Sequence, residues 1–230
     1  MRTLEEIVGA HPYPGRGLVV GTTLTGEAYW AYWLTGRSTE SKARRATIEA
    51  ARIVIDANTS ATARDPLRHY TALRRRTRGL VVGNGEQVDF VADGLDAGTS
   101  FMTLLHELQP EPDPPIMTPR IVAVTDIVGA GWGHVVLGAA RMSQGDPARA
   151  EWVIEDCERI VRGQALVLHT YASDGVDVRT DAVVRRAEFS GTREKLGAVL
   201  WSALDQRFRV LLIDGDPGME QVVVHEQPRR

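Results

Sequence analysis

Three arginines stand beside a glycine or a proline, next to segments that favour β-strands. Arg16 lies between two glycines, Arg37 follows a glycine and Arg120 follows a proline. A guanidinium group binds phosphate through two parallel hydrogen bonds, and the ends of several strands can meet at one cleft. Each arginine taken singly is explained as a surface residue. The three together indicate a candidate anion site.

The usual catalytic signatures are missing from the sequence. It contains no Walker loop, no dinucleotide fingerprint, no His-Glu-x-x-His and no Gly-x-Ser-x-Gly. The six histidines are scattered, and their spacing indicates no metal site. Cys157 is the single cysteine, which excludes an internal disulfide and a cysteine-based zinc site, and buried packing is favoured for it over a nucleophilic role. An enzyme without metal or cofactor is the simpler interpretation.

Strands are expected to carry these residues. A turn at 25–26 joins the β-branched segment 17–22 to the aromatic segment 27–33, a pattern typical of a β-hairpin. Segment 43–57 has helix-favouring residues but also a β-branched run, and we favour strands there. Asn84-Gly85 is typical of a type I′ hairpin turn. Further strands are predicted at 70–73, 79–82, 88–91, 120–124, 132–140, 165–171 and 209–213.

Two helices are predicted from apolar residues at helical spacing, at 97–108 and 193–204. The prolines of 110–115 prevent the first helix from continuing. Many strands, two helices and no regular βαβ alternation predict an α+β domain in which helices cover sheets. Without an internal repeat or linker, residues 1–230 are expected to form a single domain.

Composition narrows the class of protein. A formal net charge of −3 argues against non-specific binding to nucleic acid or a membrane surface. The basic run 74–78 alternates faces on a strand and is interpreted as a solvated strand edge. The N-terminal residues show no secretory signal, and no apolar stretch is long enough to span a membrane. We therefore expect a cytoplasmic protein.

Seven short motifs follow one another along the chain. They are Tyr13-Pro14-Gly15-Arg16-Gly17, Gly36-Arg37-Ser38, Asp65-Pro66 followed by Tyr70, Asn84-Gly85 with Asp89, Glu111-Pro112-Asp113, Thr118-Pro119-Arg120-Ile121, and His169-Thr170-Tyr171 followed by Asp174-Gly175. No single motif is specific. Their order, from about residue 12 to 175, resembles the archaeal-type inosine monophosphate cyclohydrolases and their bacterial relatives.

The resemblance implies a fold and a reaction. The implied fold is a four-layer α-β-β-α sandwich similar to N-terminal-nucleophile hydrolases, which also favours strands at 43–57. That class's chemistry does not follow from the fold, because the residue next to Met1 is Arg2 and not the Thr, Ser or Cys that a processed nucleophile requires. The implied reaction closes the second purine ring: the carboxamide nitrogen of 5-formamidoimidazole-4-carboxamide ribonucleotide attacks the formyl carbon, and loss of water gives inosine monophosphate.

The resemblance also implies roles for individual residues. Tyr70 and Glu111 match a tyrosine and a glutamate of the family's site and would move protons, with either allocation of acid and base allowed. The arginines would contact the substrate's phosphate, and Asn84 with Gly85 would contact its carboxamide or base edge. The implied substrate-binding residues are Arg16, Arg37, Ser38, Lys42, Asn84, Gly85 and Arg120.

The chain departs from the family's pattern at 39–42 and 86–88, which leaves its substrate open. Lys42 stands where the family has an arginine, and it replaces the charge but not the fork geometry. One alternative is ring closure or amide hydrolysis on a related nucleotide. Another is a non-catalytic nucleotide-binding protein that needs neither Glu111 nor Tyr70. Five tryptophans leave a homo-oligomer open as well.

Overall fold

In the computed structural model, which describes residues 1–57, 67–143, 145–146 and 149–228, the chain forms strands and a few helices. The strands are β1 (Arg16–Thr22), β2 (Ala28–Thr35), β3 (Arg44–Glu49), β4 (Arg52–Ala57), β5 (Tyr70–Arg75), β6 (Gly79–Gly83), β7 (Arg120–Val128), β8 (Gly131–Met142), β9 (Ala150–Cys157), β10 (Gln164–His169), β11 (Arg185–Glu188), β12 (Arg209–Gly215) and β13 (Val222–Glu226). The helices are α1 (Leu4–Val8), α2 (Thr39–Lys42), α3 (Gln87–Asp96), α4 (Phe101–Glu107) and α5 (Arg193–Ala203).

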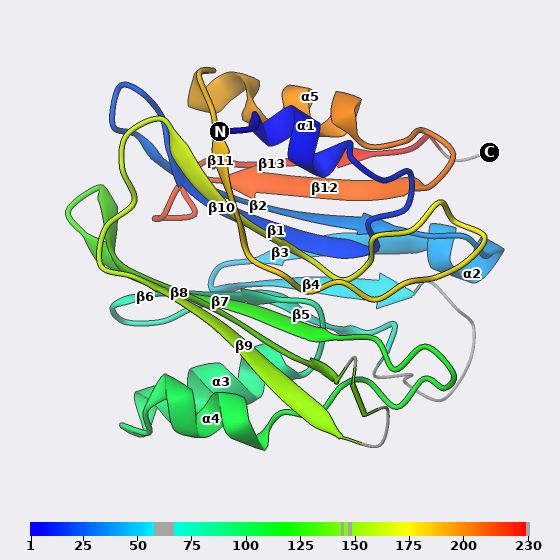
Figure 1. Cartoon of the computed structure of the whole chain (residues 1–230). Coiled ribbons are helices and arrows are strands. Elements are labelled where there is room, and N and C mark those ends of the chain that lie inside the picture. Colours follow the sequence, from blue (N-terminus) through cyan, green and yellow to red (C-terminus); the bar gives the residue numbers. More distant parts are fainter. Residues whose placement is uncertain (58–66, 144, 147–148, 229–230) are drawn as a thin grey trace.

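The strands form two antiparallel sheets that face each other (Figure 1). The six-stranded sheet has the order β11-β10-β1-β2-β12-β13, and the seven-stranded sheet runs in the order β3-β4-β5-β6-β7-β8-β9. Helices α1 and α5 cover the outer face of the first sheet, and α3 and α4 cover the outer face of the second. The predicted α+β class is confirmed.

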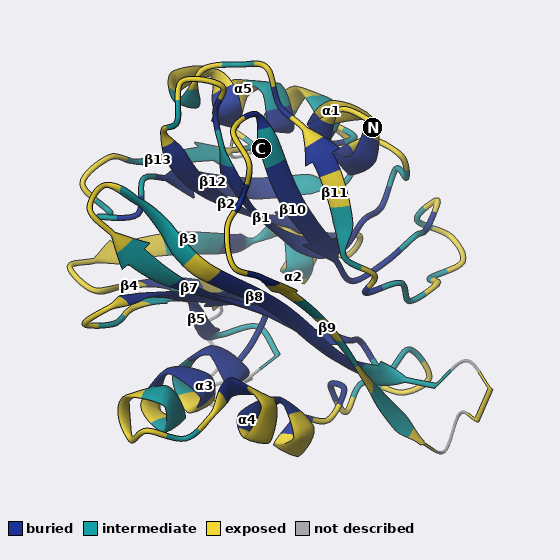
Figure 2. Cartoon of the chain, turned by 60° about the vertical axis from the view of Figure 1, so that its left-hand side comes forward, coloured by how far each residue is buried: buried dark blue, intermediate teal, exposed yellow. Residues whose placement is uncertain are grey.

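The aromatic strand β2 shows why the six-stranded sheet is buried on both faces. Successive side chains of a strand point to opposite faces. Trp30 and Tyr32 therefore pack between the sheets, while Tyr29 and Trp33 pack beneath α1 and α5. Figure 2 shows β1, β2 and β10 buried along most of their length. Full burial of one large apolar side chain stabilises a fold by about 1.5–3 kcal/mol, so this strand anchors the layers.

The predicted hairpin at 17–33 is confirmed by the pairing of β1 with β2. Segment 43–57 forms strands β3 and β4, as favoured. The other predicted strands are also present, apart from 88–91. The predicted helix 193–204 corresponds to α5, with Leu196, Leu200 and Leu204 buried. Cys157 is buried in the core between the sheets.

The strand predicted at 88–91 is wrong, and so is the hairpin turn at Asn84-Gly85. These residues lead into helix α3 instead. Val88, Val91 and Ala92 lie at helical spacing and pack against the seven-stranded sheet. The same covering layer contains α4, which begins at Phe101 rather than at residue 97 because the Ser100 side chain accepts a hydrogen bond from Thr103 N and caps the helix there.

The basic run 74–78 does not lie at a sheet edge, because β5 pairs with both β4 and β6. Arg74 forms ion pairs with Asp89 and Asp93 of α3, and Arg76 forms one with Asp96. Ion pairs from this basic run therefore connect α3 to the seven-stranded sheet. The sequence patterns did not predict α1, α2, β9, β11 or β13. Among the described residues, no helix has the length and apolar character needed to cross a bilayer.

Candidate functional site

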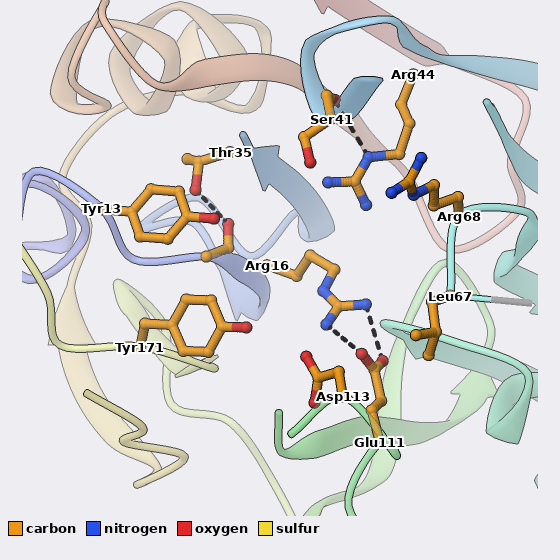
Figure 3. Close-up of a pocket in the computed structure, with 11 residues that line it drawn as sticks. Tyr13, Arg16, Thr35, Ser41, Arg44, Leu67, Arg68, Glu111, Asp113 and Tyr171 are labelled. Carbon is orange, nitrogen blue, oxygen red and sulfur yellow. Dashed lines mark hydrogen bonds and ion pairs between the residues drawn. The ribbon is translucent and has the colours of Figure 1, made fainter. Parts of the chain in front are cut away.

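A polar cavity of about 150 Å³ lies where the N-terminal end of β1, the ends of β2 and β3 and the loop after α4 converge (Figure 3). Its volume is below the roughly 300–1,000 Å³ of sites that enclose a whole ligand, so the described residues surround only part of a nucleotide-sized molecule. The cavity is lined by Tyr13, Gly15, Arg16, Thr35, Ser41, Arg44, Leu67, Arg68, Glu111, Asp113 and Tyr171.

The central contact of the cavity is a buried ion pair between Arg16 and Glu111. The Nη1 and Nη2 atoms of Arg16 donate to the two carboxylate oxygens at 2.8 and 2.7 Å. Nη1 also donates to the main-chain oxygen of Asn84 at 2.8 Å. Arg16 is 7% exposed and Glu111 is 2% exposed, so water screens the pair little. The pair joins the two sheets, since Arg16 begins β1 and Glu111 precedes β7.

Burial and charge act in opposite directions on both partners. Burial disfavours the cation of Arg16, but Glu111 and Tyr70 outweigh it and hold the pKa of the guanidinium well above its ordinary value. Burial raises the pKa of the Glu111 carboxyl, and the attraction of Arg16 opposes that rise without cancelling it. The result is a carboxylate that takes up a proton more readily than an exposed glutamate does.

The loop that carries Glu111 is held by its own side chains. The main-chain nitrogen of Glu111 donates to the oxygen of Thr118 at 2.8 Å, which closes the loop. Asp113 accepts from both the main-chain nitrogen and the hydroxyl of Thr118. The Thr118 hydroxyl also hydrogen-bonds the phenol of Tyr171, from the six-stranded sheet's side of the cavity. Burial raises the pKa of Tyr171 to about 12, so this phenol stays protonated at neutral pH.

Tyr70 reaches across the interface between the sheets but does not line the cavity. Its phenol oxygen lies 2.7 Å from that of Tyr32, and both residues are buried. Tyr70 is close enough to Arg16 to contribute to raising its pKa. Both residues that resemble the family's proton-handling pair therefore interact with Arg16, Glu111 through two hydrogen bonds and Tyr70 through an electrostatic interaction.

Asn84, Gly85 and Arg120 lie around this ion pair. Besides its main-chain contact with Arg16, Asn84 accepts from Ile121 N with its side-chain oxygen. A Cβ atom on Gly85 would stand 3.4 Å from Glu111 Oε1 and 3.2 Å from Arg120 Nη1. Arg120 binds Gln87 and Glu86 and faces a separate hollow of about 570 Å³.

Arg37, Ser38 and Lys42 are exposed and do not line the cavity. Arg37 stacks on the ring of Tyr13, a cavity residue, at 5.4 Å from the ring centre. Ser38 caps α2, its side chain accepting from Ser41 N at 3.1 Å. The structure therefore gathers Arg16, Glu111, Tyr70, Asn84, Gly85 and Arg120, but leaves these three at or beyond the rim. Asp65-Pro66 lies outside the described residues.

The sequence patterns missed several residues that line the cavity. Tyr13, Asp113 and Tyr171 stand in the seven motifs, but their residue types and spacing indicate no role for them. Arg44 and Arg68 carried a weaker signal: each is an arginine just before or at the start of a strand, the same feature that drew attention to Arg16 and Arg120. Within the described part of the chain, no group of three or more His, Cys, Asp or Glu residues is arranged to hold a metal ion.

Fold and site together define an α+β protein with a charged cavity between two facing sheets. The chain belongs to the IMP cyclohydrolase-like protein family, whose model matches residues 13–213. A segment of 125 residues, 54% of the chain, is 29% identical to the IMP cyclohydrolase of Methanocaldococcus jannaschii. That match spans 61% of the archaeal protein.

Proposed function

We propose that the protein closes the purine ring of 5-formamidoimidazole-4-carboxamide ribonucleotide to give inosine monophosphate and water. The observation that carries the proposal is the buried Arg16–Glu111 pair at the cavity, in a chain that belongs to the cyclohydrolase-like family. In the same proposal, residues 1–230 form one domain, and the four layers correspond to the N-terminal-nucleophile hydrolase fold without its processed nucleophile.

The chemistry requires a proton acceptor and stabilisation of an oxyanion. The carboxamide nitrogen forms a bond to the formyl carbon, and the formyl oxygen becomes an alkoxide. That oxygen then leaves as water, with one proton from the carboxamide nitrogen and one from the formamide nitrogen. An amide nitrogen is a weak nucleophile, so holding it against the formyl carbon contributes much of the rate.

Glu111 is suited to accept the carboxamide proton, because burial raises its pKa toward neutral pH. Arg16 stays cationic and is placed to stabilise the developing alkoxide. Tyr70 would donate a proton to the departing oxygen. The reverse allocation between Glu111 and Tyr70 is chemically equivalent, but Glu111 lines the cavity and Tyr70 does not, which favours the glutamate as the group that meets the carboxamide.

The test is turnover of the formamido ribonucleotide by purified protein, followed as inosine monophosphate. Glu111→Gln and Tyr70→Phe should each lower kcat by about 10²–10⁴-fold, the usual contribution of general acid–base catalysis. Glu107→Gln is the matched control, since Glu107 is exposed at the end of α4 and should leave kcat unchanged. Unchanged kcat in both site variants would refute the assigned roles.

Two other results would redirect the proposal. A folded wild-type protein that binds inosine monophosphate without turning over the formamido ribonucleotide would indicate a nucleotide-binding protein. If the folded protein neither binds inosine monophosphate nor converts the formamido ribonucleotide, the substrate is better sought among related nucleotides. The departures from the family's pattern at 39–42 and 86–88 agree with that outcome. Binding is measured as a rise in the unfolding temperature, which follows ligand occupancy whatever the chemistry.

A further inference from the structure

Arg44 is buried at the cavity, yet it pairs with no carboxylate among the residues that the structure describes. Only 7% of its surface is exposed. Its Nε atom donates to the main-chain oxygen of Ser41 at 3.2 Å. The two terminal nitrogens make no hydrogen bond or ion pair within the described part of the chain, and the side chain points into the cavity (Figure 3). Among the described residues, these two nitrogens therefore have no acceptor, and their donors are open to a molecule in the cavity.

Arg16 and Arg120, two other arginines near the cavity, are engaged differently. Arg16 is held by Glu111 and Asn84, and Arg120 is held by Gln87 and Glu86. Burying a cation without a counter-charge is unfavourable, so such a group is retained where a ligand supplies the missing negative charge. Arg44 is therefore a cavity arginine whose partner is best supplied by a bound molecule.

The neighbours of Arg44 indicate which chemical group of the bound molecule lies beside it. Ser41 and Arg68 line the same part of the cavity, and Figure 3 shows both beside Arg44, with Glu111 and Asp113 on the other side of Arg16. Two guanidinium groups and a hydroxyl are suited to the several oxygens and the double charge of a phosphate monoester. A single carboxylate would use fewer of these donors.

We propose that Arg44, with Ser41 and Arg68, binds the phosphate monoester of the ligand. The identity of that ligand as a purine nucleotide rests on the proposed function; the phosphate site itself does not. Arg44 takes the place that the sequence pattern gave to Lys42, two residues earlier and exposed. The opposite end of the ligand then points toward Arg16 and Glu111, which places the reacting carboxamide near the carboxylate.

The test compares inosine monophosphate with inosine, which lacks the phosphate, by titration calorimetry at fixed ionic strength. Arg44→Gln should weaken binding of inosine monophosphate by about 10- to 150-fold, the range expected for lost hydrogen bonds to a charged group. It should leave inosine binding within twofold of the wild type. Arg44→Lys keeps the charge but not the fork, so we expect an intermediate loss that is again specific to the nucleotide.

Arg45→Gln is the matched control. Arg45 is the next residue on β3, its guanidinium lies 3.7 Å from Glu226, and it does not line the cavity. Binding of inosine monophosphate to this variant should equal that of the wild type. If instead Lys42→Ala weakens binding and Arg44→Gln does not, the proposal is overturned. An equal loss for nucleotide and nucleoside would also overturn it, because it would mean that Arg44 only shapes the cavity.

Inorganic phosphate separates this proposal from the proposed function. Phosphate should raise the unfolding temperature of the wild type and of Arg45→Gln more than that of Arg44→Gln at the same concentration. This outcome supports the phosphate site even if the formamido ribonucleotide is not a substrate. An identical rise in all three proteins would show that phosphate acts only as a general stabilising salt, and would refute the site.

Discussion

The phenol oxygens of Tyr32 and Tyr70 lie 2.7 Å apart, although the two residues belong to different sheets. Tyr32 is in the middle of β2, and Tyr70 begins β5. Burial, reinforced by Tyr70, raises the pKa of Tyr32 well above its ordinary value, so its phenol stays protonated at neutral pH. A buried hydroxyl of one sheet thus fixes the orientation of Tyr70 on the other.

Removing the Tyr32 hydroxyl should disturb Tyr70 without removing it. In Tyr32→Phe the buried phenol of Tyr70 loses this hydrogen bond, and we expect destabilisation by about 1–3 kcal/mol together with a lower kcat. Unfolding in urea and steady-state kinetics would measure the two effects. Tyr29→Phe, on the same strand, removes a buried hydroxyl that has no hydrogen-bond partner in the described residues, and it should be neutral in both. Equal effects of the two substitutions would contradict this account.

The Arg16–Glu111 pair should show strong coupling in stability. Glu111→Gln leaves the buried Arg16 cation without its counter-charge, and losses of about 3–5 kcal/mol are usual when one partner of a buried pair is removed. Replacing both residues by methionine should recover much of that loss, because no charge is then left buried. Urea unfolding of the single and double variants measures the coupling. Losses that simply add would show that Arg16 and Glu111 do not stabilise the fold as a coupled pair.

Much of the fold follows from local patterns, and the exceptions have identifiable causes. The hairpin at 17–33 was predictable because its turn and its β-branched and aromatic residues agree. Segment 84–91 was not, because Asn84-Gly85 has the composition of a hairpin turn while the Asn84 side chain in fact binds Ile121 N, across the sheet. That contact depends on residues distant in sequence. The short edge strand β11 has the sequence RRAE and therefore little apolar patterning of its own.

Part of the cavity was predictable from the sequence, because two of its residues stand in recognisable motifs. Arg16 and Glu111 belong to motifs that resemble a known family, and they meet. Lys42 was expected at the site from its position in a motif, but the short helix α2 leaves it exposed, and Arg44 lies at the cavity instead. A displacement of two residues changes which side chain is buried. No local pattern in the sequence specifies it.

His169 should make the protein less stable in mild acid. Burial, followed by the charge of Arg185, outweighs Asp181 and lowers the pKa of His169 from 6.5 to about 4. Between these values the unfolded chain binds a proton that the folded chain does not, so stability is lost as pH falls from 6.5 to about 4. The loss attributable to this group is at most about 3 kcal/mol.

Urea unfolding of wild type and His169→Gln across that range tests the assignment. The variant should show a flatter dependence of stability on pH, whatever its stability at pH 7. His106→Gln is the control, since His106 is exposed on α4. A slope that is identical in wild type and His169→Gln would assign the acid sensitivity to other groups.

Gly15 has a left-handed backbone and also lies in close contact with residues of the cavity wall. Gly98 has a left-handed backbone without such contacts, so comparing the two glycines separates the effect of the backbone from that of the contacts. Gly15 has φ +75°, and a Cβ atom there would stand 2.1 Å from Thr170 Oγ1 and 2.5 Å from the Tyr171 ring. Gly98 has φ +86° with nothing within 4 Å of such an atom. Gly98→Ala should therefore lose only the backbone contribution, about 1–2 kcal/mol of stability, and leave kcat unchanged.

Gly15→Ala should lose more stability than Gly98→Ala, and should lower activity by displacing Tyr171 from the cavity wall. Urea unfolding and steady-state kinetics on the two variants measure both terms; equal losses of stability with full activity in each would mean that the contact with Tyr171 does not shape the site.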